Sequence, residues 1–283
     1  MSHPNYAHRN PKALLTKAMH GLLDRMERAS RVPMHALTPD QARAAYAAGS
    51  GVLELPVQKL PIIENLTVTA RDGYAIPVRH YAAASGDLPV LVYFHGGGFT
   101  VGSIETHDGL CRRLCHLAHC AVLSVDYRLA PQFKFPTAHE DAWDVVQWVK
   151  AHGSNHALDS SRVAVGGDSA GGTLAAACAI EARNAGMALA LQLLFYPGTV
   201  GHQDTPSHKK FDKGFVLDEA QINYFFEHYL RTAADRDDWR FAPLDGVDEG
   251  GSEIDLAGVA PAWIGLAECD PLVDEGVAYA DRL

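Results

Sequence analysis

The chain has 283 residues, and its 24 lysines and arginines against 34 aspartates and glutamates give a formal net charge of −10 at pH 7. Nucleic-acid-binding proteins draw much of their affinity from basic side chains, so this acidic chain, which has no basic run, is not expected to bind nucleic acid. With 47% hydrophobic and 20% charged residues, the chain can bury a large core, which excludes intrinsic disorder.

The N-terminus, the apolar stretches and the cysteines indicate where the protein resides. Met1 to Pro11 is polar and lacks the apolar run of a signal peptide. The longest dense apolar stretch, residues 188–196, is far shorter than the roughly 20 residues that a membrane-spanning helix needs. The five cysteines are odd in number and scattered, which argues against a disulfide framework. We therefore expect a soluble, cytoplasmic protein without a membrane span.

The first fifty residues predict two helices. Apolar residues at spacings of three and four between Leu15 and Met26 place one stripe along the first helix. The second helix follows Thr38, where Thr-Pro-Asp-Gln has the form of a capping box with proline at the first helical position. We assign residues 1–51 to an N-terminal helical cap segment and residues 52–283 to the core.

Beyond residue 61 the pattern changes to short runs rich in β-forming residues. The later runs are continuously apolar and are separated by helical stretches at 138–150 and 172–185, which is typical of a mostly parallel sheet covered on both faces. The first two runs lie close enough together to pair antiparallel. The sequence thus predicts an α/β fold, with strand candidates at 65–70, 75–81, 89–94, 121–126, 162–166, 189–196 and 262–267.

A long segment separates the last two strand candidates. Within it, the apolar residues from Ile222 to Leu230 follow a helical pattern, with Asp218 as the expected N-cap. Long insertions in α/β folds often carry function. We expect residues 201–240 to form a cap insertion that acts as a lid together with the N-terminal helices; the alternative is an extra surface helix.

A G-x-S-x-G motif lies between a strand candidate and a helix candidate, at Gly167-Asp168-Ser169-Ala170-Gly171. Flanking glycines allow the sharp turn that exposes a serine hydroxyl at the edge of a sheet. The following helix directs its N-terminus at the same place, where partial positive charge favours a developing oxyanion. We therefore predict that Ser169 is a nucleophile and that Asp168 makes a structural hydrogen bond.

Three consecutive glycines follow another strand candidate, in His95-Gly96-Gly97-Gly98-Phe99. Such a run lets backbone N–H groups approach a ligand without side-chain clashes, as an oxyanion hole requires. A phosphate-binding loop is the alternative, but no Gly-Lys-Ser/Thr follows, and Phe99 and Val101 interrupt the G-x-G-x-x-G register. A simple tight turn would not account for the serine motif.

Five motifs follow one another along the chain: His95–Phe99, Asp126–Pro131, Phe135–Pro136 with Glu140–Ala142, Gly167–Gly172, and Asp270–Leu272 with Asp274–Gly276. In this order they resemble the bacterial hormone-sensitive-lipase-like esterases of the α/β-hydrolase fold, over nearly the whole chain. The resemblance implies a mostly parallel central sheet flanked by helices, a helical cap and no cofactor. It also implies Ser169 as nucleophile, Asp270 as triad acid, and the N–H groups of Gly96, Gly97 and Ala170 as oxyanion hole.

Asp270 is also favoured by its place in the predicted fold. It follows the strand candidate 262–267, and the carboxyl ends of strands are where open α/β sheets hold ligands and catalytic groups. Asp274 is the rival carboxylate, but it lies further into the next helix. We therefore assign the acid to Asp270.

The triad histidine is missing from the sequence. The α/β-hydrolases carry their triad in the order Ser, Asp, His, and no histidine follows His228 in this chain, which ends at Leu283. We expect that the chain is truncated there, and that the last strand, the last helix and the histidine lie beyond Leu283. The alternatives are a histidine supplied by another subunit and a natural ligand-binding relative, as in the plant gibberellin receptor. His202 and His208, in the long segment between the last two strand candidates, are expected at the surface.

A metal site is the remaining alternative near His116 and His119, because Cys111, Cys115 and Cys120 are close in sequence. Neither a C-x-x-C pair nor H-E-x-x-H is present. We expect buried structural thiols and no bound metal.

We thus predict a serine carboxylesterase that hydrolyses short-chain acyl esters through an acyl-enzyme. The 283-residue chain itself is expected to be nearly inactive, because loss of a triad histidine lowers turnover by about a million-fold in the subtilisin case. The expected partner is a small-molecule ester, and a homodimer stays open. The alternative function is a non-catalytic ligand-binding protein.

Overall fold

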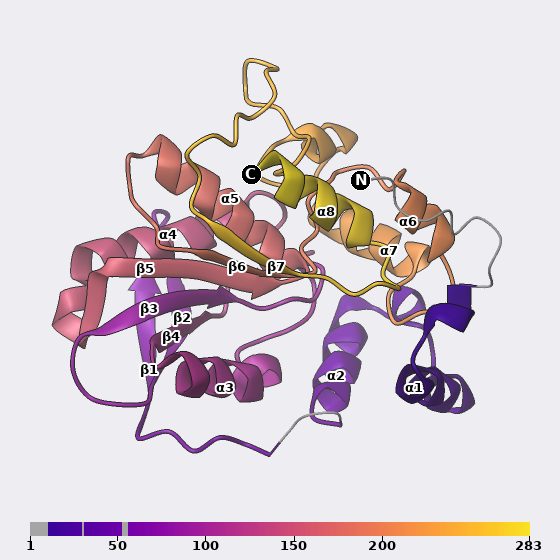
Figure 1. The fold of residues 1–283 in the computed structure, drawn as a ribbon, viewed down its shortest axis with the longest axis horizontal. Coiled ribbons are helices and arrows are strands. Elements are labelled where there is room, and N and C mark those ends of the chain that lie inside the picture. The colour runs from indigo at the N-terminus through magenta and orange to yellow at the C-terminus, as the bar shows by residue number, and fades with distance from the viewer. Residues whose placement is uncertain (1–10, 30, 53–55) are drawn as a thin grey trace.

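A central sheet organises the computed structural model, which describes residues 11–29, 31–52 and 56–283. Its strands are arranged in the order β1-β2-β4-β3-β5-β6-β7 (Figure 1). The predicted strand candidates are all confirmed, while residues 1–10, 30 and 53–55, which the predicted cap and core include, lie outside the described residues. The strands are β1 Ile62–Thr69, β2 Ala75–Ala82, β3 Leu88–Phe94, β4 Ala121–Val125, β5 Leu158–Asp168, β6 Gln192–Phe195 and β7 Ala262–Gly265.

Most of the sheet is parallel, as the continuous apolar runs predict. The first pair, β1 and β2, is antiparallel, which confirms the predicted entry, and β2 is also antiparallel to β4. From β4 through β3, β5 and β6 to β7 every pairing is parallel. The carboxyl ends of these strands therefore meet at one edge of the sheet, and the segments that follow Phe94, Asp168 and Gly265 all start there.

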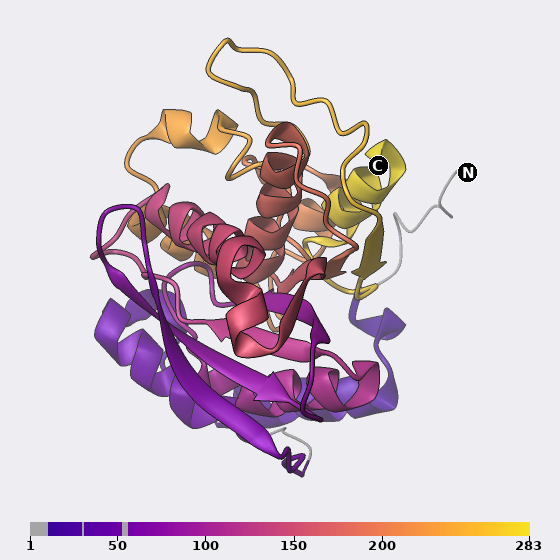
Figure 2. The ribbon, with the colours of Figure 1, turned by 90° about the vertical axis from the view of Figure 1, so that its left-hand side faces the viewer.

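The helices form layers on the sheet and a separate group beyond it. In Figure 1, α3 lies below the sheet and α4 and α5 lie above it, whereas α1, α2, α6 and α7 gather to its right. In Figure 2 the strands are turned relative to one another, the twist usual in such sheets. The helices are α1 Lys17–Arg28, α2 Pro39–Ser50, α3 Asp108–Ala118, α4 Thr137–His152, α5 Ala170–Asn184, α6 Pro206–Lys210, α7 Glu219–Tyr229 and α8 Val273–Arg282.

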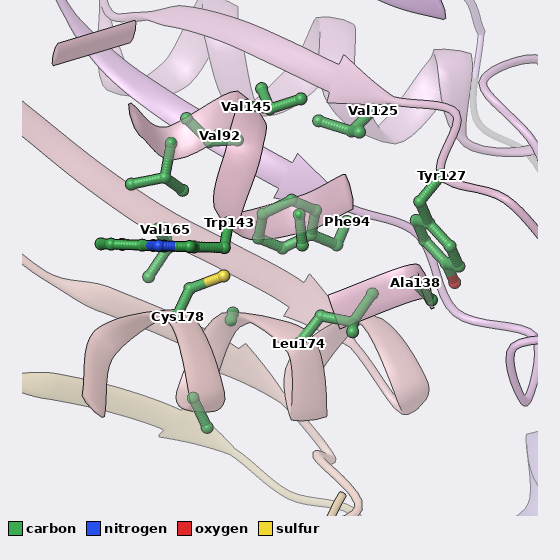
Figure 3. Close-up of a cluster of buried hydrophobic side chains, with 14 of the residues drawn as sticks. Val92, Phe94, Val125, Tyr127, Ala138, Trp143, Val145, Val165, Leu174 and Cys178 are labelled. Carbon is green, nitrogen blue, oxygen red and sulfur yellow. The ribbon is translucent and has the colours of Figure 1, made fainter. Parts of the chain in front are cut away.

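Alternate side chains of β3 divide the core between the two faces of the sheet. Val92 and Phe94 belong to the larger hydrophobic cluster with Trp143 of α4, as Figure 3 shows. Leu91 and Tyr93 point to the opposite face and pack with the cysteines of α3. Full burial of one such side chain contributes about 1.5–3 kcal/mol to stability. The central strand is thus buried on both faces, and its last residues are held firmly at the edge of the sheet.

The predicted helix starts are confirmed. The Thr38 hydroxyl accepts a hydrogen bond from the Gln41 backbone, and the Gln41 side chain accepts one from the Thr38 backbone, which completes the capping box of α2. Asp218 caps α7 by accepting from Gln221 N at 2.8 Å. The cap helices therefore form by local signals that the sequence carries.

The two cap segments pack on each other and on the core. Ala42 of α2 and Phe225 of α7 share a hydrophobic cluster with Val101, which follows the glycine run. Helix α1 differs, because none of its residues is buried despite its apolar stripe. The cap thus contains one pair of helices fixed to the core and a more exposed first helix.

The two cysteines of α3 and Cys120, which precedes β4, are buried, as predicted. Cys111 and Cys115 are fully buried, and Cys120 is 9% exposed. His116 and His119 are exposed. Among the described residues no group of three or more His, Cys, Asp or Glu side chains could hold a metal ion.

No helix in the described ranges has the length and apolar character needed to cross a membrane.

Candidate active site

Ser169 occupies a strained turn between β5 and α5. Its backbone has φ of +53° and ψ of −120°, a conformation that a residue with a side chain rarely adopts and that is found mainly at functional sites. The turn is possible because Gly171 has no side chain: a Cβ atom there would overlap the carbonyl oxygen of Phe94. The close approach of α5 to β3 therefore fixes the serine at the edge of the sheet.

Ser169 borders two adjoining cavities. The outer cavity has a volume of about 500 Å³ and is lined by cap residues, including Met19 and Tyr46, and by the segment 267–272. The inner cavity has a volume of about 60 Å³ and is lined mainly by apolar side chains, including Phe226. Gly98, Ser169, Leu217, Phe225 and Leu272 line both cavities. The serine thus lies where a large, open space meets a small, apolar one.

Asp270 follows β7 and lines the outer cavity together with Ser169. Its Oδ1 accepts a hydrogen bond from Leu272 N at 2.8 Å. Burial raises the pKa of this carboxyl, although the hydrogen bond from the Leu272 amide and the electrostatic influence of nearby His208 act in the opposite direction. The rival Asp274 lines neither cavity and instead accepts from Ser207 N at 2.8 Å.

The amide of Gly96, which the sequence predicts as part of the oxyanion hole, already has a hydrogen-bond partner in the structure. Its N–H donates to Asp168 Oδ1 at 3.0 Å in a buried hydrogen bond, so it is not available to a substrate. Gly97 and Gly98 line the outer cavity, and neither amide donates a hydrogen bond to another described residue. Ala170, the first residue of α5, lines the inner cavity beside the serine.

Asp168 makes the structural hydrogen bonds that the sequence suggests. Besides the Gly96 amide, it accepts from the Tyr93 hydroxyl at 2.8 Å and lies 3.4 Å from His107 Nε2. Burial would raise the pKa of Asp168, but the hydrogen bonds from His107 and Tyr93 hold it below its ordinary value. The ionised carboxylate therefore ties the end of β5 to the glycine run that follows β3.

His95 is also structural and is fully buried. Its ring stacks on Tyr127 with centroids 4.3 Å apart, and its Nδ1 lies 2.8 Å from the Gly96 carbonyl oxygen. Burial, with a smaller effect of His107, lowers its pKa to about 3. This histidine is consequently neutral near pH 7.

The two histidines in the long segment between β6 and β7 differ in their exposure to solvent. His202 is exposed, as predicted, and pairs with Asp237 at 2.8 Å. His208 was expected at the surface but is only 6% exposed, and it is one of the residues around the inner cavity. Within residues 11–29, 31–52 and 56–283, no hydrogen bond joins any histidine to Ser169 or Asp270.

Leu283 is the residue beyond which we expect the triad histidine. It does not line the site. It is the C-cap of α8, where its N–H donates to the Tyr279 carbonyl oxygen at 3.2 Å. Its side chain is exposed, and it lines neither the outer nor the inner cavity. The histidine expected beyond Leu283 is outside this sequence, so its place in the triad stays a prediction.

Several residues of the site escape the sequence prediction. Gly98 is the third glycine of the run, and Phe225 of α7 packs so closely on it that a Cβ atom would overlap the aromatic ring. Tyr196 follows β6, has a φ of +35° and lines the outer cavity. Its place directly after an apolar strand is the signal that could have found it. The inner position of His208 has no comparable sequence signal.

Known proteins resemble this chain in both sequence and structure. Its residues 91–283 match the family described as alpha/beta hydrolase fold. An ethyl acetate hydrolase of Pseudomonas putida is 40% identical over 258 residues, which cover 89% of this chain and 79% of that protein. The carboxylic ester hydrolase LipN of Mycobacterium tuberculosis is 44% identical over 230 residues, 78% of this chain and 59% of LipN.

Among solved structures, the ester-hydrolase EH1AB1 from the metagenome of Lake Arreo, complexed with a derivative of bipyridine phosphonate, superposes with a TM-score of 0.89. The two chains are 36% identical, and the match covers 95% of this chain and 85% of the other. The strained serine turn, the parallel sheet and these similarities agree: the chain belongs to the alpha/beta hydrolase fold family.

Proposed function

We propose that this protein is a serine carboxylesterase for short-chain acyl esters. The observation that carries the proposal is the position of Ser169, which lies on a strained turn and borders a cavity shared with Asp270 and the unbonded amides of Gly97 and Gly98. Related proteins are named as ester hydrolases, which supports the same chemistry.

The proposed reaction proceeds through an acyl-enzyme. The Ser169 oxygen attacks the ester carbonyl while a base takes the hydroxyl proton, and the alcohol leaves once it has been protonated. Water then attacks the acyl-serine and releases the carboxylic acid. The amides of Gly97, Gly98 and Ala170 would hold the oxyanion, with Gly98 in place of Gly96. Asp270 would orient and stabilise the protonated base.

The size of the inner cavity supports the preference for short chains. Its volume of about 60 Å³ leaves room for a few carbon atoms, and Phe225, Phe226 and Phe241 enclose it. Helices α1 and α2 contribute side chains to the outer cavity, and α7 contributes side chains to both. We therefore infer that the helical cap, residues 1–51 and about 201–240, selects the ester by size.

The base is the part of this mechanism that the described residues do not provide. Since no histidine bonds to Ser169 or Asp270 there, a polypeptide that ends at Leu283 is expected to hydrolyse esters very slowly. In subtilisin, loss of the triad histidine lowers turnover by about 10⁶-fold, and oxyanion hole and binding supply the residual rate.

Chemical rescue tests this proposal directly. Imidazole added to the 283-residue polypeptide should raise the rate of p-nitrophenyl acetate hydrolysis above the sum of the imidazole and protein rates. The Ser169→Ala variant, which keeps the cavity, measures the background and should show no such increase. A rate equal in both proteins would contradict the serine mechanism.

Two further measurements separate an esterase from a ligand-binding protein. A fluorophosphonate should label Ser169, faster with imidazole than without, and p-nitrophenyl acetate or butanoate should react in preference to the laurate ester. Tight ligand binding without any labelling of Ser169 would favour the non-catalytic alternative. A preference for the laurate ester would overturn the proposed substrate size.

A further inference from the structure

The outer cavity contains an aromatic side chain whose ring is uncovered. Tyr196 lines this cavity together with Ser169, and it is 40% exposed. Three phenylalanines that line the two cavities have ring partners at centroid distances of 4.9–5.7 Å: Phe215 with Phe211, Phe225 with Tyr224, and Phe226 with Phe241. Among the described residues the Tyr196 ring has no such contact. Its ring is therefore open to packing against a ligand.

The backbone of Tyr196 is strained. Its φ is +35°, in a region that residues with a side chain rarely adopt. It directly follows β6, and its N–H donates to the Gly265 carbonyl oxygen of β7 at 2.7 Å. Strained conformations of this kind are found mainly at functional sites, where the surrounding structure maintains them. The strain thus points to a role for this side chain beyond packing.

Hydrogen bonds on both sides of Tyr196 connect it to the serine turn. Ser169 N donates to the Phe195 carbonyl oxygen at 2.9 Å. The Thr173 hydroxyl, in the first turn of α5, donates to the Gly198 carbonyl oxygen at 2.6 Å. The chain is therefore attached to the serine turn before and after Tyr196, which fixes the position of the ring relative to the nucleophile.

The sizes of the two cavities indicate which part of an ester meets this ring. The inner cavity, of about 60 Å³, suits the short acyl chain of the proposed substrate. The outer cavity, of about 500 Å³, has room for a larger group. With the acyl chain in the inner cavity, the alkoxy part of the ester lies in the outer cavity, beside Tyr196.

Aromatic rings attract one another by more than the burial of apolar surface. Offset-stacked and edge-to-face pairs gain a further contribution from the charge distribution of the two rings. A saturated ring of the same size is more hydrophobic but lacks this contribution. A preference that depends on the aromatic character of the ligand therefore identifies contact with an aromatic side chain.

We propose that Tyr196 is a specificity-determining residue whose ring packs against an aromatic group in the alkoxy part of the substrate. The preferred substrates are then short-chain esters of benzyl-type alcohols or of phenols. This inference rests on the proposed function, since it assumes that Ser169 attacks an ester whose acyl chain occupies the inner cavity. Tyr196 is assigned to binding of the substrate and not to proton transfer.

Binding to the Ser169→Ala variant, which cannot form an acyl-enzyme, tests the proposal without turnover. Benzyl acetate and cyclohexylmethyl acetate, which have the same number of non-hydrogen atoms, are titrated separately by NMR. Benzyl acetate should bind at least as tightly as cyclohexylmethyl acetate, although it is the less hydrophobic of the two. The ring current of benzyl acetate should also shift the ring proton resonances of Tyr196.

Three variants in the same background identify the residue responsible. Tyr196→Leu removes the ring, so the ratio of the affinity for benzyl acetate to that for cyclohexylmethyl acetate should fall about threefold to tenfold, the extra attraction of one aromatic pair. Tyr196→Phe keeps the ring and should keep the ratio. Trp263→Leu is the control, because this 50% exposed aromatic side chain of β7 lines neither cavity, and it should leave the ratio unchanged.

The outcomes distinguish the inference from the function on which it rests. If both esters bind but the affinity ratio survives in Tyr196→Leu, or if Tyr196→Phe lowers it as much as Tyr196→Leu does, the packing role of the ring is overturned and the esterase proposal stands. If neither ester perturbs the resonances of Gly98 or Ala170, both proposals are wrong.

Discussion

The edge of the sheet around Ser169 and the predicted cap helices beside it differ in the interactions that hold them. At the sheet edge, buried hydrogen bonds and close glycine packing fix the backbone, as at Asp168 and Gly171. In the cap, apolar side chains from α2 and α7 pack together, and α1 buries no residue. The comparison teaches that the backbone around Ser169 is fixed by buried hydrogen bonds, whereas the helices that we propose select the ester differ among themselves, with α2 and α7 packed on the core and α1 exposed.

The largest expected effect comes from breaking the rigid region at Asp168. Replacing Asp168 with alanine leaves the Gly96 amide and the Tyr93 hydroxyl buried without an acceptor, so we expect a loss of about 3–5 kcal/mol in the free energy of unfolding. Urea denaturation measures it. Asp270→Ala is the matched control, since that carboxylate accepts a single backbone hydrogen bond, and it should cost less than about 1 kcal/mol. Equal losses of unfolding free energy in the two variants would contradict the structural role assigned to Asp168.

The second effect concerns the pH dependence of stability through His95. Its pKa is about 3 in the folded protein, against an ordinary value of 6.5, so the unfolded chain binds a proton first as the pH falls. Stability is therefore retained above pH 6.5 and lost progressively below it. Between pH 6.5 and 4.5 the wild type should lose about 2–3 kcal/mol more than His95→Asn, whose side chain does not titrate. If the two proteins lose the same free energy of unfolding between pH 6.5 and pH 4.5, His95 does not cause this pH dependence.

The third prediction tests the attachment of the cap. Arg43 of α2 donates from Nε to the Thr100 carbonyl at 3.0 Å and from Nη2 to the Ala130 carbonyl at 2.6 Å. Arg43→Met keeps most of the side-chain volume but loses these hydrogen bonds, so we expect a loss of about 2 kcal/mol. Arg28→Met, at a side chain that is 79% exposed, should lie within about 0.5 kcal/mol of the wild type. A negligible effect of Arg43→Met would mean that α2 is held by its apolar contacts alone.

The smallest effect is expected in α1. Leu23 lines the outer cavity but is only half-buried, so Leu23→Ala should lower the free energy of unfolding by less than about 1 kcal/mol. Leu174→Ala in α5, at a side chain that is 1% exposed, should cost about 2–5 kcal/mol. If the two leucine variants lose similar free energies of unfolding, α1 is packed as tightly as α5, and the contrast between the cap and the sheet edge is wrong.

Much of the fold was predictable because local signals agree with the final packing. Strands buried on both faces appear as continuous apolar runs, and the N-caps Thr38 and Asp218 mark the starts of their helices. The start of β5 was missed, because its pairing continues through a register shift to Leu158 opposite Leu88. Irregular pairing of this kind depends on the neighbouring strand and has no local pattern.

The site was predictable where one residue type can do the chemistry, as at Ser169. It was not predictable where the role depends on contacts between distant segments. The three glycines of the run look alike in sequence, and only the approach of the Asp168 carboxylate decides that the Gly96 amide is occupied. His208 is buried beside Glu275, a residue far along the chain whose position the local sequence does not indicate.

The partners of Arg43 have a consequence for how the protein responds to salt. Its inward hydrogen bonds end on two backbone carbonyls and on the side-chain oxygen of Gln132 at 2.7 Å, all of which are uncharged. Dissolved ions screen attractions between exposed opposite charges far more than short hydrogen bonds to neutral groups in partly buried positions. The contribution of Arg43 to the attachment of α2 should therefore be almost independent of ionic strength, so α2 should stay packed on the core at high salt as in dilute buffer.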